Sequence, residues 1–457
     1  MDNPNSTTQS LAKLGLDLNS RVIVVGLGAT GLSAARFLAG HGIQLAVADT
    51  REKPPGLSEI RELLPDVAIF LGGFDTMAFD RATHLVVSPG VALETPTIQQ
   101  AIRSGTPVFG DLDLFACVAA APIIGITGSN GKSTVTTLLG LMAQADSRNV
   151  KVGGNLGTPM LDLLDPNADL YVLELSSFQL ERSALLEATA ATVLNISPDH
   201  MDRYPSLQAY ADAKSRIFKG DGLMVLNADD PMVESMALKG RRQVRFSVKE
   251  GTQAEYRIAD IEGTACLVRK GKSILPASEL RIKGRHNVAN ALAATALGDA
   301  VGLSDAAMAK AMREFSGLDH RMQWVADIGG VSYINDSKAT NVGACVAALD
   351  GLSNPTVLIA GGDGKGADFS QLAEVVAGKV RAVVLMGRDA PQLEQVLTPV
   401  VSTVRVGNMA QAVAEAHKLA QPGDVVLLAP ACASLDQYKD YQERGRIFAE
   451  TVRSLQS

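Results

Sequence analysis

The sequence is poor in cysteine, in tryptophan and in long apolar runs. Its 457 residues include 4 cysteines, Cys117, Cys266, Cys345 and Cys432, which are too far apart for a zinc-binding template. So few cysteines suit a reducing compartment. No apolar run approaches about 18 residues, so we expect no membrane-spanning helix. The first residues, "MDNPNSTTQS", lack the pattern of a signal peptide, so we expect a cytoplasmic protein.

The charge balance is mildly acidic. The chain has 42 basic and 49 acidic residues, a formal net charge of −7, which argues against a nucleic-acid partner. Hydrophobic residues make up 46% and charged residues 20%, as in globular proteins and unlike disordered ones. A chain of 457 residues is too long for one ordinary core, so we expect several domains.

Short β-branched runs alternate with helical patterns along almost the whole chain, which predicts an α/β fold with parallel sheets and crossover helices. The predicted strands fall into three series: 21–25, 44–49 and 84–88; then 122–127, 170–177, 192–197 and 223–230; then 331–337, 356–362, 382–387 and 425–430. We therefore predict three domains, 1–110, 111–317 and 318–457, with boundaries where glycine ends a segment. The mixed, polar pattern of 240–282 predicts extra β structure on the middle domain.

The first glycine-rich loop is "VVGLGATGLSAARFL". Gly26, Gly28 and Gly31 make the G-x-G-x-x-G pattern between a predicted strand and a helix, and Asp49 ends the next strand. Such a loop brings a diphosphate to a helix N-terminus. A nicotinamide or flavin cofactor, a nucleotide sugar, and a turn that serves only packing all fit this segment.

The second loop is "GITGSNGKSTVTT", Gly125 to Thr137. It departs from the common G-x-x-x-x-G-K-[ST] pattern because Ile126 stands where glycine is usual. Backbone amides from Gly128 to Gly131 can surround phosphates, and Lys132 can reach the terminal ones. A hydroxyl of Ser133 or Thr134 can hold Mg²⁺. The sequence therefore predicts a nucleotide triphosphate site here.

Acidic and basic residues follow the next strands of the middle domain. Glu174 ends an apolar strand, and in a parallel sheet that position lies beside the phosphate loop, where a carboxylate can hold Mg²⁺. His200 lies in a polar loop, "SPDHMDRYP", and is a ligand candidate, although a lone histidine is more often structural. Lys214 follows on a predicted helix, where a solvated face is the default interpretation.

With these pieces together, the chain resembles the Mur ligase family of bacterial cell-wall synthesis. The likeness covers nearly the whole chain and rests on ten stretches in order: "GLGATGLS", "SPG", "GITGSNGKSTVTT", "GGNLG", "LELSSFQLE", "DHMDRYP", "GRHNVANALAA", "INDSKATN", "GGDGKGADFS" and "PACASLDQYKDYQERG". The resemblance implies a Rossmann-like UDP-binding domain, a central P-loop ATPase-like domain and a Rossmann-like C-terminal domain. It also implies ATP-dependent amide-bond formation through an acyl phosphate.

The resemblance assigns roles to individual residues. ATP is expected at Gly128, Ser129, Asn130, Gly131, Lys132, Ser133, Thr134, Asn287, Asn290, Arg321 and Asp336. The UDP-sugar is expected at Gly28, Ala29, Thr30, Asp49, Thr50, Arg51, Gly90 and Asn155. Metal ligands are expected at Ser133, Glu174, His200 and Lys214, and catalytic groups at Lys132, His200, Lys214 and Lys338. Two Mg²⁺ ions are expected, with Lys214 carbamylated.

For the amine substrate the resemblance favours D-glutamate, held by Thr340, Lys365, Ser434, Leu435 and Tyr441, where some relatives carry phenylalanine at 441. The other substrate is expected to be UDP-N-acetylmuramoyl-L-alanine, and the protein is expected to be a monomer whose last two domains close on the substrates. Two alternatives stay open. One is a related acyl-phosphate ligase such as a folylpolyglutamate synthase, whose phosphate loop typically has glycine where this chain has Ser133. The other is a nucleotide-dependent oxidoreductase that uses "GLGATG".

Overall fold

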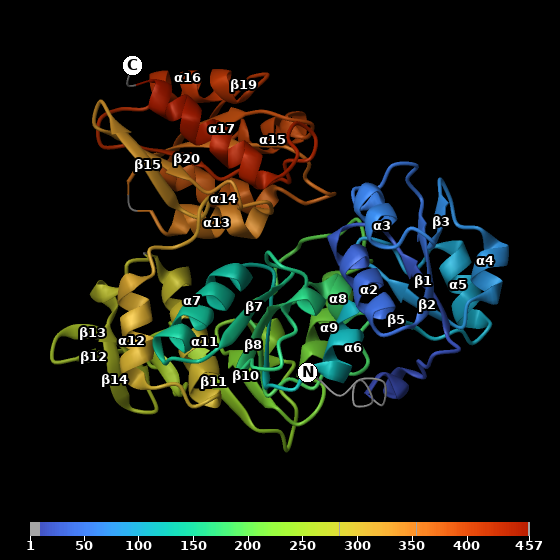
Figure 1. Cartoon of the computed structure of the whole chain (residues 1–457). Helices are drawn as coiled ribbons and strands as arrows, with labels where there is room; N and C mark the ends of the chain where they lie inside the picture. The colour runs from blue at the N-terminus through green and yellow to red at the C-terminus, as the bar shows by residue number, and fades with distance from the viewer. Residues whose placement is uncertain (1–9, 283, 353, 456–457) are drawn as a thin grey trace.

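The computed structural model describes residues 10–282, 284–352 and 354–455. Within these ranges the chain forms three α/β domains, each around its own sheet, as the sequence predicts. In Figure 1 the last domain (orange to red) lies above the middle domain (green to yellow), and the first domain (blue) lies beside the middle one. The polar segment 1–9, which carries the signal-peptide argument, lies outside the described residues. In the described part of the chain, no helix has the length and apolarity that a bilayer crossing requires.

The first domain is a parallel sheet in the order β3-β2-β1-β4-β5. Its strands are β1 (Arg21–Val25), β2 (Gln44–Asp49), β3 (Ala68–Leu71), β4 (His84–Val87) and β5 (Val108–Phe109). Its helical segments are η1 (Ala12–Leu14), α2 (Ala29–Gly40), α3 (Leu57–Leu63), α4 (Thr76–Arg81) and α5 (Pro96–Arg103), followed by α6 (Asp111–Val118). β1, β2 and β4 occupy the centre of the sheet and are the three strands that the sequence predicts.

The middle domain contains a mixed sheet in the order β14-β13-β12-β11-β10-β9-β6-β8-β7. Its strands are β6 (Ile123–Thr127), β7 (Val150–Gly154), β8 (Leu170–Glu174), β9 (Ala190–Val193), β10 (Leu223–Asn227), β11 (Gln243–Ser247), β12 (Tyr256–Ile261), β13 (Thr264–Arg269) and β14 (Lys272–Pro276). Its helical segments are α7 (Lys132–Ala145), η2 (Met160–Leu163), α8 (Ser177–Leu180), α9 (Leu207–Ser215), η3 (Arg216–Phe218), α10 (Pro231–Glu234), η4 (Ala277–Glu279), α11 (Arg285–Ala300) and α12 (Asp305–Glu314). The antiparallel strands β13 and β14 extend the parallel part, which confirms the extra β structure expected in 240–282.

The last domain has the strand order β15-β16-β20-β17-β18-β19, with β15 antiparallel at one edge. Its strands are β15 (Gln323–Ile328), β16 (Val331–Asn335), β17 (Thr356–Ala360), β18 (Val380–Leu385), β19 (Ser402–Arg405) and β20 (Val425–Leu428). Its helices are α13 (Val342–Asp350), α14 (Ser370–Lys379), α15 (Ala390–Leu397), α16 (Met409–Leu419) and α17 (Tyr441–Ser454). Ligands of such sheets bind at the carboxyl ends of the strands.

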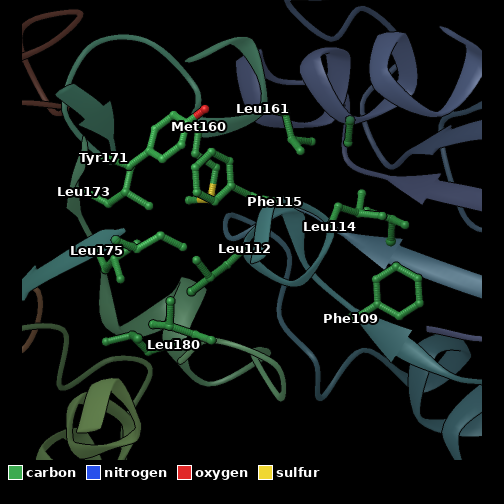
Figure 2. Close-up of a cluster of buried hydrophobic side chains, with 14 of the residues drawn as sticks. Phe109, Leu112, Leu114, Phe115, Met160, Leu161, Tyr171, Leu173, Leu175 and Leu180 are labelled. Atoms are coloured by element: carbon green, nitrogen blue, oxygen red, sulfur yellow. The ribbon is translucent and has the colours of Figure 1, made fainter. Parts of the chain in front are cut away.

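The first and middle domains share one hydrophobic core. Figure 2 shows Leu112 and Phe115 of α6 beside side chains of the middle domain, whereas Leu114 and Phe109 lie on the opposite side of α6. All four belong to one buried apolar cluster with residues of both domains. The rings of Phe115 and Tyr171 meet edge to face, with centroids 5.0 Å apart. Asp113 adds a buried polar contact, because its carboxylate accepts a 2.7 Å hydrogen bond from Ser183 Oγ. The two domains are therefore joined by apolar burial, and the boundary near 110 stays a prediction.

The two buried apolar clusters of the last domain are made of residues of that domain alone. Its hydrogen bonds to the middle domain include those from Arg321 Nη2 to Ser133 Oγ at 2.8 Å and from Lys365 Nζ to Asp199 Oδ1 at 3.0 Å. Separating two domains that meet through polar contacts exposes little apolar surface and therefore costs little free energy. The interface between the middle and last domains is thus the one suited to domain motion. The boundary near 317 stays a prediction.

Candidate active site

The phosphate loop lies between β6 and α7, as its sequence predicts. Gly128 has φ +146° and Gly131 has φ +86°, conformations that L side chains rarely adopt. A Cβ at Gly131 would also lie 2.5 Å from Asn290 Oδ1. Lys132 folds back over the loop, and its Nζ donates to Gly128 O at 2.8 Å and to Ser129 O at 2.9 Å. The loop and its lysine are thus preformed.

Asn195, just after β9, braces this loop. Its main-chain oxygen accepts from Ser129 N at 2.9 Å, and its Oδ1 accepts from Asn130 N at 2.8 Å. These two amides, expected to surround phosphate, are therefore engaged within the protein. The N-terminus of α7 has no side-chain cap, so its first-turn amides are the ones that face outward. Sequence reasoning missed Asn195, whose only signal is a polar residue directly after an apolar strand.

Glu174, at the end of β8, is 3% exposed. Its Oε1 accepts from Asn155 Nδ2 at 2.7 Å, and among the described residues its buried Oε2 has no hydrogen-bond partner. Burial raises the pKa of this carboxyl, but Lys132, Ser133 and further polar neighbours outweigh it, so the net pKa is lowered and the group is an anion. An anionic oxygen without a partner, beside a serine hydroxyl and a phosphate loop, fits the oxygen ligands that Mg²⁺ takes.

Lys214 is buried, and the expectation of a solvated face is wrong. The residue is 1% exposed, its Nζ donates to Gly128 O at 3.0 Å, and the amine lies 4.5 Å from the centre of the Tyr210 ring. Burial and then the charge of Lys132 lower its pKa well below the ordinary value. The helix α9 therefore turns a neutralisable amine toward the phosphate loop, where the resemblance expects Lys214, and not toward solvent.

His200 lies in the loop after β9 with a left-handed backbone, φ +58°. Its Nε2 is 3.8 Å from Asp199 Oδ2, and its ring meets that of Phe178 at 4.9 Å. Burial lowers the pKa of His200 to about 4, with Asp199 opposing, so the imidazole is neutral at pH 7. A neutral imidazole is the form that binds metals. In the described part of the chain, no three side chains of His, Cys, Asp or Glu group as a metal site, so a second ion would need ligands beyond these types.

Cations of the last domain reach the phosphate loop. Arg321 donates to Ser133 Oγ, and Lys365 pairs with Asp199, as given above. Lys338 Nζ lies 3.9 Å from the centre of the Tyr441 ring. Burial, then Arg321 and Lys132, lower the pKa of Lys338 to about 8. Burial and neighbouring cations lower the pKa values of Lys132, Lys214 and Lys338, and an anionic ligand would relieve this crowding, so the site is suited to phosphate and carboxylate groups.

Seven of the eleven residues expected around ATP line one cavity of about 920 Å³ between the middle and last domains: Asn130, Gly131, Thr134, Asn287, Asn290, Arg321 and Asp336. Lys338, expected as a catalytic group, lines it as well, whereas Gly128, Ser129, Lys132 and Ser133 are not among its lining residues. Asn290 Nδ2 donates to Asn287 Oδ1 at 3.2 Å. Burial raises the pKa of Asp336 to about 6, with Arg321 opposing. The structure brings this predicted set together, while nucleotide binding to it stays a prediction.

The residues expected around D-glutamate lie at the ends of several elements of the last domain. Thr340 precedes α13, Lys365 follows β17 with φ +52°, and Tyr441 begins α17. Ser434 is 3% exposed, whereas the Leu435 side chain beside it is 70% exposed. The contact of Lys365 with Asp199 places it at the middle domain, and the role of the other four in substrate binding stays a prediction.

The three glycines of the first glycine-rich loop have different structural roles. Gly26 has φ +93°, and a Cβ on Gly31 would lie 1.8 Å from Gly26 O, so these two serve the turn and the packing of α2. A Cβ on Gly28 would meet no described atom within 4 Å, which leaves the N-terminus of α2 accessible to a ligand. Gly90 is equally open, whereas Asn155 donates to Glu174, as described above, and therefore lies beside a residue expected to be a metal ligand.

Beside this loop, the side chains of Asp49 and Arg51 form a hydrogen-bonded ion pair. Leu27 N donates to Asp49 Oδ2 at 2.7 Å, and Arg51 Nε donates to Asp49 Oδ1 at 2.8 Å. Burial raises the pKa of Asp49, but Arg51 and the Leu27 amide outweigh it and lower the pKa to about 2. The Asp49 carboxylate is therefore already satisfied, and it orients the loop and the arginine. Ala29, Thr30 and Thr50 lie around the same helix start and strand end, and their contact with a uridine nucleotide stays a prediction.

Two substitutions in this loop are expected to have different effects: Gly28→Ala should weaken diphosphate binding, and Gly31→Ala should lower the stability of the fold. We expect Gly28→Ala to keep the melting temperature, because its φ is −93° and its Cβ has open space. Its methyl group lies where a diphosphate would approach α2, so uridine diphosphate should bind about tenfold or more weakly. Gly31→Ala should lower the melting temperature, because its Cβ would collide with Gly26 O. Thermal melting measures the stability of each variant, and calorimetric titration measures its affinity for uridine diphosphate. If Gly28→Ala binds uridine diphosphate normally, the assignment of this loop as the diphosphate site is wrong.

Comparisons with known proteins cover the whole chain. Models of the MurD-like N-terminal domain, the Mur ligase middle domain and the Mur ligase glutamate ligase domain match residues 20–110, 126–298 and 320–432. UDP-N-acetylmuramoylalanine--D-glutamate ligase of Methylococcus capsulatus is 65% identical over 98% of both chains. The protein of that name from Nitrosococcus oceani is 54% identical over 95% of this chain and 97% of its own.

Solved structures agree on the fold. A pseudomurein peptide ligase type C from Methanothermus fervidus has a TM-score of 0.62 at 17% identity, over 96% of this chain and 100% of its own. A UDP-N-acetylmuramate-alanine ligase from Thermotoga maritima has a TM-score of 0.59 at 20% identity, with the same coverage. A nicotinamide- or flavin-dependent oxidoreductase is not among these relatives. With a preformed phosphate loop, a buried Glu174 beside it and full-length identity of 65% to a named ligase, the chain belongs to the Mur ligase family.

Proposed function

We propose that this Mur ligase joins D-glutamate to the L-alanyl carboxylate of UDP-N-acetylmuramoyl-L-alanine, with ATP as the second substrate. The observation that carries the proposal is the group of cations from two domains around the phosphate loop. Lys132 and Lys214 come from the middle domain, and Arg321, Lys338 and Lys365 come from the last. The relatives from Methylococcus capsulatus and Nitrosococcus oceani, 65% and 54% identical over nearly their whole length, bear the name of this reaction.

The first step creates a leaving group on the carboxylate. A carboxylate oxygen attacks the γ-phosphorus of ATP, the bond from phosphorus to the β–γ bridging oxygen breaks, and ADP leaves while an acyl phosphate forms. Both reactants are anions, so the step needs positive charge placed beforehand. Lys132, at the phosphate loop, and Arg321, which donates to Ser133, supply it from opposite domains.

Mur ligases use ATP and Mg²⁺. The ion would be held by Oε2 of Glu174, which has no hydrogen-bond partner among the described residues, and by the hydroxyl of Ser133. It would supply further positive charge for the phosphates. A carbamylated Lys214, together with His200, would provide oxygen and nitrogen ligands for a second ion. The buried position and lowered pKa of Lys214 support this, because only the neutral amine adds carbon dioxide.

The second step uses the last domain. The neutral amine of D-glutamate attacks the acyl carbon, the tetrahedral intermediate expels inorganic phosphate, and the amine loses a proton as the amide forms. Two carboxylates on D-glutamate need cations and hydroxyls around them. Lys365 would bind one of them, which is supported by the ion pair that its amine forms with the carboxylate of Asp199. Thr340 and Ser434 would supply hydroxyls, and the Lys338 ammonium lies against Tyr441.

A two-substrate assay tests the proposal. Purified protein should release phosphate from ATP only when UDP-N-acetylmuramoyl-L-alanine and D-glutamate are both present, and mass spectrometry should find their amide. L-glutamate in place of D-glutamate is the matched control and should give little product. Strong turnover without the sugar nucleotide, or with a folate as acceptor, would support the folylpolyglutamate-type alternative. Oxidation of a reduced nicotinamide on turnover would support the oxidoreductase.

A further inference from the structure

The start of α13 connects the last domain to the phosphate loop through Asn341. This side chain is 6% exposed, and its Oδ1 accepts from Ala344 N at 2.8 Å, which caps the helix. Its Nδ2 donates across the domain boundary to Asp199 Oδ2 at 3.1 Å and to Asn130 Oδ1 at 3.3 Å. One buried amide therefore begins a helix in one domain and holds two loops of the other.

Gly343, in the first turn of α13, makes the approach close enough. A Cβ at this position would lie 2.8 Å from Ser197 Oγ and 3.0 Å from Ser197 Cβ. Ser197 is itself part of the loop brace, because Ser129 Oγ donates to Ser197 O at 2.9 Å and Asn130 Nδ2 donates to Ser197 Oγ at 3.3 Å. The glycine is needed here for contact with the middle domain, since it lies within a regular helix.

The contact differs from the other bridges between these domains. Arg321 and Lys365 carry charge and lie where substrate anions are expected, so a substrate competes for them. Asp199 uses Oδ1 for Lys365 and Oδ2 for Asn341. A substrate carboxylate that draws Lys365 away therefore leaves the bond from Asn341 in place.

We propose that Asn341 is a positioning residue: by docking α13 on Asn130 and Asp199, with Gly343 against Ser197, it sets the phosphate loop and the His200 loop in the domain arrangement that reacts. The inference rests on the proposed ligase reaction and adds to it a neutral contact that closes the site. Asn341 acts through Asn130 and Asp199 and not on the reacting atoms.

Asn341→Ser and Asn341→Asp test this role, because both side chains can still cap α13. Serine is too short to keep both cross-domain bonds, and aspartate sets a second carboxylate against Asp199. We expect melting temperatures close to wild type. We expect kcat to fall about tenfold in Asn341→Ser and further in Asn341→Asp, with little change in KM for the sugar nucleotide, which the first domain is proposed to hold. Asn408→Ser is the matched control, since Asn408 caps α16 in the same domain and should leave kcat unchanged.

Exchanging the side chains of residues 341 and 199 distinguishes the proposed positioning role of Asn341 from its role as a helix cap. In Asn341→Asp combined with Asp199→Asn, the amide and the carboxylate trade places and the pair can form again. We expect the double variant to be at least several-fold faster than the product of the two single effects predicts. Additive effects, or a kcat for Asn341→Ser within twofold of wild type, would overturn the proposal. Failure of the ligase assignment is distinguishable, because wild-type protein would then not turn over the substrate pair at all.

Discussion

Lys132→Ala is expected to lower kcat by about 10²-fold or more, the loss typical of removing one preorganised electrostatic group. The amine donates hydrogen bonds to Gly128 O and Ser129 O, and its charge is the strongest of those that lower the pKa of Glu174. Removing it leaves the reacting carboxylate and the phosphates with less positive charge between them. Phosphate release with both substrates at saturation measures the effect.

The folding of Lys132→Ala is expected to survive. Burial lowers the pKa of Lys132 and outweighs the charges of Glu174 and Asp199, which raise it, so the amine lies in a place that disfavours its charge. Removing such a group leaves the melting temperature unchanged or raises it, as when an active site trades stability for function. The exposed lysine Lys310 on α12 is the matched control and should change neither property. A near-normal rate for Lys132→Ala would overturn the assignment of the phosphate loop.

The inner strands of the parallel sheets could be predicted one by one from sequence, whereas the edge strands β3, β5, β7, β15 and β19 could not, and β11 to β14 could be predicted only together as extra β structure in 240–282. β1, β6 and β17 are continuous apolar runs because both faces of a parallel sheet are covered. β3 and β19 lie at sheet edges and are only partly buried, so short polar-flanked segments suffice there and give little signal. Their positions depend on neighbours that are remote in sequence.

The same division holds for the site. Lys132, Ser133 and Glu174 follow from a local pattern, because a glycine loop and a strand end fix where a side chain must lie. The pairing of Asp199 with Lys365 and Asn341 joins residues of different domains and has no local signature. The burial of Lys214 is of the same kind: its helix carries polar residues that suggest solvent, and only packing against the phosphate loop covers the amine.

Lys214→Ala is expected to lower kcat by about 10²-fold or more, and short-chain acids such as acetate are expected to restore part of it. If the lysine acts as a carbamate, its loss removes two oxygen ligands of a metal ion, and a small carboxylate can enter the space that the side chain leaves. Lys214→Ala without the acid, and Lys310→Ala with it, are the controls. The restored rate should rise with acid concentration and then saturate, as binding in a defined space requires.

A direct readout separates a carbamate from a plain lysine. Protein incubated with ¹³C-bicarbonate should show a carbamate carbon resonance that Lys214→Ala lacks. The geometry favours the modification because the amine is buried, carries a lowered pKa and lies 3.0 Å from Gly128 O in the loop that would hold the phosphates. A protonated lysine there would add to the cations around Lys132, whereas a carbamate would reverse its charge and allow metal binding beside the loop. An inactive Lys214→Ala that acetate does not restore, in a protein without the resonance, would leave Lys214 as an unmodified amine and remove the second metal site.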